Sequence, residues 1–158
     1  MATYNRTATG GGTAGHPANA AVPYVITSPV WDTADGGTGG DIVQLIDVPA
    51  DTMIVSGCLE VLEAAGNGQV TLDIGFTGGD VDTFMDGSPM AAGFSPFLEA
   101  SIGASGSNCR MLTSADTIDA LILDAASTGE SAARFRIHVV LADVSKNPTE
   151  SATVSTGT

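Results

Sequence analysis

The chain has 158 residues, the size of one ordinary domain. It is strongly acidic, with 18 Asp and Glu against 5 Lys and Arg and a formal net charge of −13 at pH 7. Binding to nucleic acid or to an anionic membrane surface needs Lys and Arg side chains opposite phosphates, so this balance excludes both functions. Gly (20) and Pro (7) are abundant and aromatic residues make up 5%, which favours many turns and a mainly aliphatic core.

Residues 1–21 are small, polar and rich in glycine, so they cannot bury enough apolar surface to fold alone. They predict a flexible N-terminal arm in which Tyr4 and Arg6 are the side chains suited to hold a neighbour. The arm lacks the basic and apolar regions of a signal peptide, and no apolar run approaches the 18 residues of a membrane span. We therefore expect the chain to be made in the cytoplasm.

Short apolar or alternating segments follow at fairly regular spacing from residue 22 to residue 144. The first, Val22–Val30, contains Pro23 and Pro29, and proline confines a strand to the edge of a sheet. Thr52–Ala64 and Gln69–Ile74 flank the turn residues Gly66, Asn67 and Gly68, which predicts a β-hairpin. The other predicted strands are Asp41–Val48, Phe94–Ile102, Cys109–Thr113, Asp116–Asp124 and Ala133–Val144.

Side-chain alternation within these segments predicts which residues face the core. In the last segment Phe135, Ile137, Val139 and Leu141 are expected to point inward, and the intervening Arg134, Arg136 and His138 outward. In Thr52–Ala64 the alternation shifts near Ser56, which predicts a β-bulge at Gly57.

Residues Gly75–Gly93 are rich in Gly and Asp. This composition predicts a long interaction loop with a few apolar anchors, among them Phe84 and Met85. No segment has a helical stripe longer than two turns. Eight or nine short strands indicate an all-β, antiparallel β-sandwich or jelly-roll-like domain over residues 22–144, followed by a polar C-terminal tail, 145–158.

The residues needed for catalysis are sparse. Nucleophilic catalysis requires a base beside Ser, Cys or Thr, yet His16 lies in the arm and His138 lies in the middle of a strand. No Gly-x-Ser-x-Gly is present, and no Gly-rich segment continues into the Gly-Lys-Ser/Thr of a phosphate loop. The sequence therefore predicts a protein that is no enzyme and uses no cofactor.

Two further groups of residues leave alternatives open. Asp80, Asp82 and Asp86 lie in a Gly-bounded loop, where a solvated acidic loop is the favoured interpretation and a weak Ca²⁺ site the other, although the spacing is not that of an EF-hand. Cys58 and Cys109 are either two free thiols, which the sequence favours, or a single disulfide.

Several of these segments resemble a run found in structural proteins of tailed bacteriophages, namely small capsid decoration (cement) or head-fibre proteins. The resemblance covers roughly residues 41–143, and its strand and turn patterns are Asp41–Val55, Leu59–Val61, Leu72–Gly75, Asp80–Gly87 and Asp116–Leu123.

The resemblance implies a β-sandwich on the outer surface of a phage head shell, made in the host cytoplasm. Its partners would be the major capsid protein and other copies of itself, commonly as a homotrimer, and it implies no catalytic residues. We expect Tyr4, Arg6, Trp31, Phe84 and Met85 to make contacts with the capsid or with sister copies. The alternative is a head-fibre or tail adhesion module that binds the host surface or glycans, with Trp31 as its stacking platform.

Overall fold

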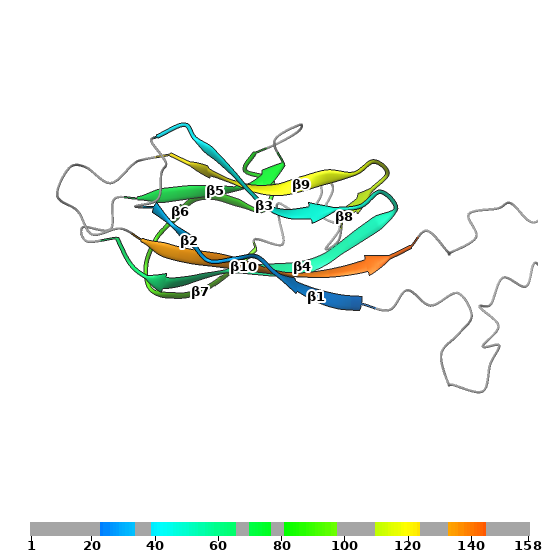
Figure 1. Cartoon of the computed structure of the whole chain (residues 1–158), viewed down its shortest axis with the longest axis horizontal. Helices are drawn as coiled ribbons and strands as arrows, with labels where there is room; N and C mark the ends of the chain where they lie inside the picture. Colours follow the sequence, from blue (N-terminus) through cyan, green and yellow to red (C-terminus); the bar gives the residue numbers. More distant parts are fainter. Residues whose placement is uncertain are drawn as a thin grey trace, which may run out of the picture.

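The computed structural model describes residues 23–33, 39–65, 70–76, 81–97, 110–123 and 133–144. These residues form strands and turns without an α-helix, in two antiparallel sheets packed face to face (Figure 1). The strands are β1 Pro23–Thr27, β2 Trp31–Asp32, β3 Ile42–Val48, β4 Thr52–Glu63, β5 Thr71–Phe76, β6 Met85–Pro89, β7 Gly93–Pro96, β8 Arg110–Leu112, β9 Asp116–Ile122 and β10 Arg134–Asp143. The predicted all-β sandwich is confirmed.

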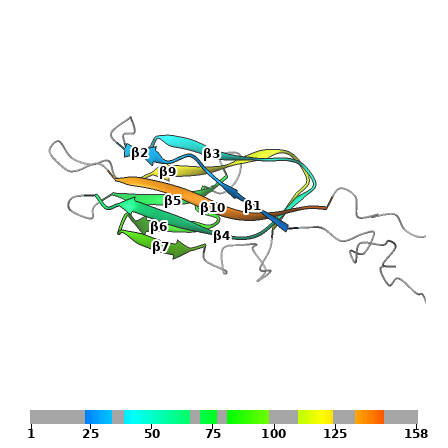
Figure 2. The same ribbon diagram turned by 60° about the horizontal axis from the view of Figure 1, so that its bottom comes forward.

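The larger sheet has six strands in the order β1-β10-β4-β7, with β2 also on β10 and β8 also on β4. The smaller sheet has the order β3-β9-β5-β6. Strand pairing is nested, because β1 pairs with β10, β3 with β9, β4 with β7 and β8, and β5 with β6. The chain thus resembles one long antiparallel hairpin rolled into two layers, which is the arrangement of a jelly roll (Figure 2).

Most predicted strands are confirmed, and so is the edge position of the first. β1 lies at the end of the larger sheet, as its prolines require. The chain leaves the ladder at Pro29, and there Ser28 bonds to β10 through both its amide and its side chain, at 3.0 Å each to Ile137. The alternation in β10 is also confirmed, since Phe135, Ile137, Val139 and Leu141 are fully buried.

The predicted hairpin of Thr52–Ile74 is wrong. β4 belongs to the larger sheet and β5 to the smaller one, so the two strands face each other across the interior and do not pair edge to edge. Both strands direct aliphatic side chains inward, including Leu59 from β4 and Leu72 from β5. Turn residues can connect two strands of one sheet or two strands of different sheets, so their presence did not decide between these arrangements. Residues 66–69 lie outside the described part of the chain.

The predicted bulge position is also wrong, by two residues. Ser56 and Ile54 face consecutive residues of β10, Val140 and Leu141, so Val55 is the extra residue. Gly57 serves packing instead, because a Cβ built on it would overlap the ring of Phe97.

The segment Gly75–Gly93 is not one long loop, because it contains β6, which pairs with β5. The apolar anchors of this segment enter the core. Phe84 stacks on Phe97 with ring centroids 5.0 Å apart, and it meets Phe76 edge-on at 5.1 Å. These three rings join the two sheets, since Phe76 belongs to β5 while Phe97 follows β7 and donates its amide to Gly57 in β4.

Candidate functional site

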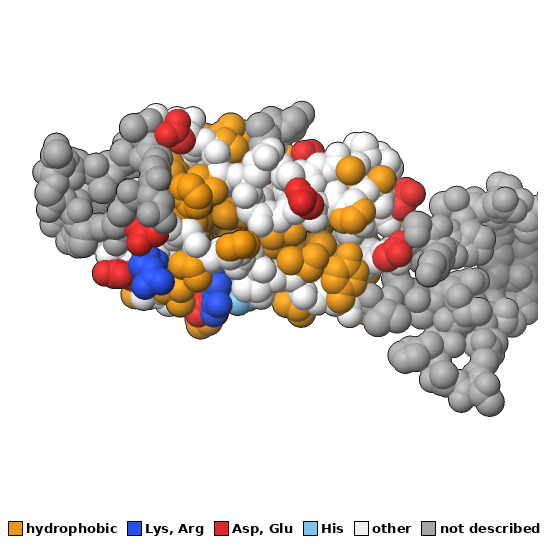
Figure 3. Space-filling model, viewed as in Figure 1, with side chains coloured by type: hydrophobic (Ala, Val, Ile, Leu, Met, Phe, Trp, Pro, Cys, Tyr) orange, Lys and Arg blue, Asp and Glu red, His pale blue; other side chains and the backbone are white. Residues whose placement is uncertain are grey.

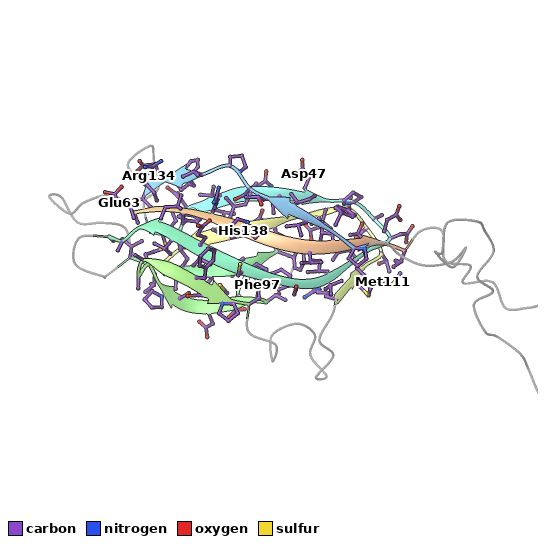
Figure 4. All side chains as sticks on the ribbon, turned by 90° about the horizontal axis from the view of Figure 1, so that it is seen from below. Asp47, Glu63, Phe97, Met111, Arg134 and His138 are labelled. Atoms are coloured by element: carbon purple, nitrogen blue, oxygen red, sulfur yellow. The ribbon has the colours of Figure 1, made fainter. Side chains whose placement is uncertain are left out.

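The outer face of the six-stranded sheet, called here the larger-sheet face, carries a row of interacting polar side chains that includes Glu60, Arg136 and His138. Figure 4 shows the described side chains on the ribbon, with His138 labelled. The ladder register directs one set of residues to this face, opposite to the buried side chains of β10 and β4. They include Val25, Thr27, Met53, Ser56, Cys58, Glu60, Phe94, Met111, Arg136, His138 and Val140.

Glu60 is the centre of this row. Arg136 Nε donates to Glu60 Oε2 at 2.5 Å, and His138 Nε2 donates to the same oxygen at 2.8 Å. Hydrogen bonds from Arg136 first, and from His138 second, hold the pKa of the Glu60 carboxyl below its ordinary value. The Glu60 side chain is only 14% exposed, and its negative charge is compensated by the contacts with Arg136 and His138.

His138 extends the row to a third strand. Because a carboxylate only accepts, Nε2 carries a proton, and in the neutral ring Nδ1 accepts from the Thr27 hydroxyl at 2.9 Å. The Phe94 ring lies on the other side, with its centroid 6.3 Å from that of the histidine. Residues from β1, β10, β4 and β7 therefore meet in one place, which no single segment of sequence reveals.

Cys58 lies opposite His138 in the β4–β10 ladder. A cysteine beside a histidine is the pairing of a thiol nucleophile and its base, but such a thiol needs a lowered pKa. Here burial, and then the nearby charge of Glu60, raise the pKa of the Cys58 thiol. Both ring nitrogens of His138 are already engaged. The arrangement suits a structural polar cluster and not nucleophilic catalysis.

Cys58 is a free thiol, and Cys109 lies outside the described residues.

The outer face of the four-stranded sheet, called here the acidic face, has a different character. Asp47, Asp73 and Asp119 lie on this side of their strands; Asp47 is exposed, whereas Asp73 and Asp119 are buried, and the charge of Asp86 acts on Asp73. The described arginines lie elsewhere: Arg134 and Arg136 extend from β10, and Arg110 packs over the Phe76 ring at 4.7 Å. Figure 3 accordingly shows the basic side chains and the histidine in view gathered on the larger-sheet side.

A shallow depression of about 440 Å³ lies between the end of β3 and the start of β9. Its lining includes Gln44, Asp47, Pro49 and Asp116. Its charged lining residues are the two carboxylates Asp47 and Asp116, and its lining contains no histidine, cysteine, lysine or arginine.

Asp73 supplies a pH-dependent prediction. It is 6% exposed, and its Oδ1 accepts a 2.7 Å hydrogen bond from the Gly87 amide. Burial raises the pKa of the Asp73 carboxyl, and the charges of Asp86 and Asp82 add to this, against the opposing Gly87 bond. Ionised Asp73 therefore costs stability above its folded pKa, and this cost disappears as the pH falls below 3.8, its ordinary value.

We expect Asp73→Asn to raise the free energy of unfolding at pH 7 by about 0.5 kcal/mol, because the amide removes the buried charge while its oxygen can still accept the Gly87 hydrogen bond. The gain should vanish at low pH, where the aspartic acid is neutral as well. Thermal unfolding of both proteins across this pH range checks the prediction. A less stable variant at pH 7 would mean that the charge-assisted Gly87 bond outweighs desolvation.

The sequence-predicted contact residues separate into three groups. Tyr4 and Arg6 lie outside the described residues. Phe84 and Met85 are 0% and 4% exposed, so both belong to the core and present no surface to a neighbour. Burial removes them from our set of contact candidates.

Trp31 is half-buried and packs against the core beside its ladder partner Phe135, so its ring is not an open stacking platform. Its Nε1 is buried and meets no hydrogen-bond acceptor within the described ranges.

The candidate Ca²⁺ set is incomplete in the described part of the chain. Asp82 and Asp86 are described, whereas Asp80 is not. Among the described residues, no group of three or more His, Cys, Asp or Glu side chains lies close enough to hold a metal ion. Nor does that part contain a helix long and apolar enough to cross a membrane.

No protein-family model and no characterised protein matches this sequence. Solved structures do match its fold. A chain of the cyanophage Pam1 capsid asymmetric unit aligns with a TM-score of 0.63 and 15% identity, over 90% of this chain and 99% of that one.

Two other chains belong to the capsid of Ralstonia phage GP4 and to the acidic stable capsid of Helicobacter pylori bacteriophage KHP30. The GP4 chain aligns with a TM-score of 0.56 and 16% identity, over 80% of this chain and 86% of that one. The KHP30 chain aligns with a TM-score of 0.52 and 13% identity, over 78% of this chain and 90% of that one. At these identities the likeness shows a shared fold: the protein has the jelly-roll sandwich found in chains of phage capsids.

Proposed function

We propose that this protein is a structural component of a bacteriophage virion, of the capsid decoration (cement) type. In this role it binds the outer surface of the head shell and adds contacts that stabilise the shell. Its partners are the major capsid protein and other copies of itself, with a homotrimer as the arrangement that the resemblance implies. The role is mechanical, and no bond-making chemistry is assigned to any residue.

One observation carries the proposal. The alignment with the Pam1 capsid chain covers 99% of that chain and 90% of this one. The two are therefore single jelly rolls of about the same size, and the match does not come from one domain inside a much larger shell protein.

The properties of the site agree with this role. The polar row of Glu60, Arg136 and His138 is internally satisfied, and the Cys58 thiol has a raised pKa. The acidic face does not suit nucleic-acid binding, because that activity needs Lys and Arg opposite phosphates.

The test uses empty shells assembled from the major capsid protein of the phage that encodes this chain. We expect the added protein to sediment with the shells at a fixed ratio and to raise the temperature at which they break open. Bovine serum albumin at the same concentration serves as the control for trapping. If the protein stays at the top of the gradient, and purified virions lack it, the proposal is wrong.

The adhesion alternative has a separate readout. A fibre or tail module would bind host cells or a glycan array without needing shells. Trp31 was its strongest aromatic candidate, and the half-buried position of this ring weakens that interpretation.

A further inference from the structure

Core-facing side chains stay partly exposed along one border of the sandwich, where β1 and β3 end their sheets. Residues opposite each other in an antiparallel ladder share a face of the sheet. Tyr24 of β1 lies opposite the fully buried Leu141, so it faces the interior, yet it is 39% exposed. Val43 of β3 lies opposite the fully buried Ala120, and it is only half-buried.

Three more apolar side chains of these strands behave in the same way. Ile26, Trp31 and Leu45 pack against the core and are half-buried. Together with Tyr24 and Val43 they form what is called here the open seam. Figures 1 and 2 place β1, β2 and β3 along one border of the sandwich, and Figure 3 shows hydrophobic side chains in view along it.

The opposite border, formed by β6 and β7, is closed. Apolar side chains within or next to these strands are at most 4% exposed, namely Phe84, Met85, Met90 and Phe97. The open seam is therefore a property of one border and not of the sandwich as a whole. Apolar side chains gathered at one place on a surface mark an interaction site more often than chance exposure.

β3 also presents a backbone edge beside the seam. It pairs with β9 on one side, and no described strand pairs with its other side. Proline commonly blocks such edges, and the end strands β1, β6 and β7 each contain one, whereas β3 does not. β3 has instead a bulge between Gln44 and Ile46, which bends an edge without removing its amides. An extended segment can therefore cover the seam and pair with β3 at the same time.

We propose that residues 2–9 of a neighbouring copy bind in the open seam as a strand added to β3. The inference rests on the self-association in the proposed function and identifies the two surfaces that make it. Because these surfaces differ, the same contact repeats from copy to copy and closes into a ring when the rotation fits. A ring of three agrees with the proposed homotrimer.

The sequence of residues 2–9 suits this position. The segment Ala-Thr-Tyr-Asn-Arg-Thr-Ala-Thr contains no glycine or proline, and its threonines and tyrosine favour strands. Eight extended residues span about 27 Å, close to the roughly 24 Å of the seven in β3. Tyr4 and Arg6 share one side of such a strand, so the ring and the aliphatic stem can cover the seam while the guanidinium stays in water.

Charge and chain length favour the same occupant. All 18 acidic residues lie from Asp32 onward, so residues 2–9 approach an acidic domain without the repulsion expected between chains of net charge −13. Residues 10–22 connect this segment to β1 and extend to roughly 45 Å at most. That reach matches the roughly 40 Å length of β4, the longest strand, so it suffices to meet the border of an adjacent sandwich.

Photo-crosslinking of the full chain identifies the occupant. The amino acid p-benzoylphenylalanine replaces Tyr4, and isotope-labelled and unlabelled proteins are mixed at low concentration and then concentrated. We expect light to join position 4 to residues in or beside β3, in peptide pairs that combine the two isotopes. The same crosslinker at Phe94, which is 69% exposed on β7 at the opposite border, is the control and should capture neither β3 nor residues 2–9.

Size-exclusion chromatography with light scattering adds a quantitative readout. Tyr4→Asp and His16→Asp each add one negative charge before β1, but only the first lies within residues 2–9. We expect the wild type to be a multimer, Tyr4→Asp to raise the dissociation constant about 30-fold, and His16→Asp to stay within about threefold of wild type. Neither position lies in a described strand, so both variants should keep the wild-type unfolding temperature.

Three results would overturn the inference. They are a wild type that stays monomeric, crosslinks that miss the β1–β3 border, and crosslinks within one isotope only, which would mean that each chain covers its own seam. On assembled shells, capture of the major capsid protein in place of β3 would overturn it as well. Shell binding is measured separately. A chain that binds shells without inter-copy crosslinks contradicts this inference and leaves the decoration role standing, whereas a crosslinked multimer that ignores shells does the reverse.

Discussion

Replacing Phe84 by alanine should lower the free energy of unfolding by about 3–5 kcal/mol, the cost of emptying a well-packed aromatic site. The Phe84 side chain is fully buried, and it contacts one ring on each side, Phe76 at 5.1 Å and Phe97 at 5.0 Å. Because these rings connect the two sheets, neither sheet alone can close the resulting cavity. Single domains have only about 5–15 kcal/mol of stability, so this is a large loss.

Urea unfolding followed by tryptophan fluorescence measures the effect of Phe84→Ala, with Trp31 as the single probe. Phe84→Leu is the matched control, since it keeps most of the apolar volume and should cost roughly 1–2 kcal/mol. Equal midpoints for wild type and Phe84→Ala would show that the ring stack does not hold the sheets together.

Gly57→Ala should also destabilise the fold, by roughly 1–3 kcal/mol. Glycine in a strand normally weakens it, so alanine at an open position would gain up to about 1 kcal/mol. At Gly57 the sign reverses, because the added Cβ would overlap the ring of Phe97. That ring cannot easily move away, since it is 4% exposed and stacked on Phe84.

Two controls separate this overlap from a general effect of alanine in β4. Ser56→Ala changes the neighbouring, exposed position and should stay within about 0.5 kcal/mol of wild type. Combining Gly57→Ala with Phe97→Leu should cost less than the sum of the single changes, because the smaller side chain makes room for the Cβ. If the two free-energy changes add strictly, the destabilisation by Gly57→Ala does not come from overlap with the Phe97 ring.

The sequence could predict individual strands because strand periodicity is a local property. β10 shows this most clearly: alternate residues are apolar, and those residues are the buried ones. The edge position of β1 could equally be predicted, since proline lacks the amide hydrogen that an inner strand must donate.

The candidate site could not be predicted in the same way. Outward-facing Glu60 and His138 were each recognisable as surface residues of their strands, but the sequence does not say that β4 and β10 are neighbours. Glu60 and His138 are 78 residues apart in the sequence, and their contact depends on the long-range pairing of β4 with β10. The same limit explains Phe84 and Met85, whose burial depends on β6 joining the smaller sheet.

The sequence by itself thus determined the all-β class, most strand intervals, the inward and outward sides of the strands, and the strongly acidic charge. These follow from side-chain chemistry within a few residues. Tertiary structure alone decided that β4 and β5 lie in opposite sheets, that the sandwich is a jelly roll, and that Glu60, Arg136 and His138 meet on one face. Those outcomes depend on which strands exchange backbone hydrogen bonds, and any pair of strands can satisfy that chemistry until the whole core is packed.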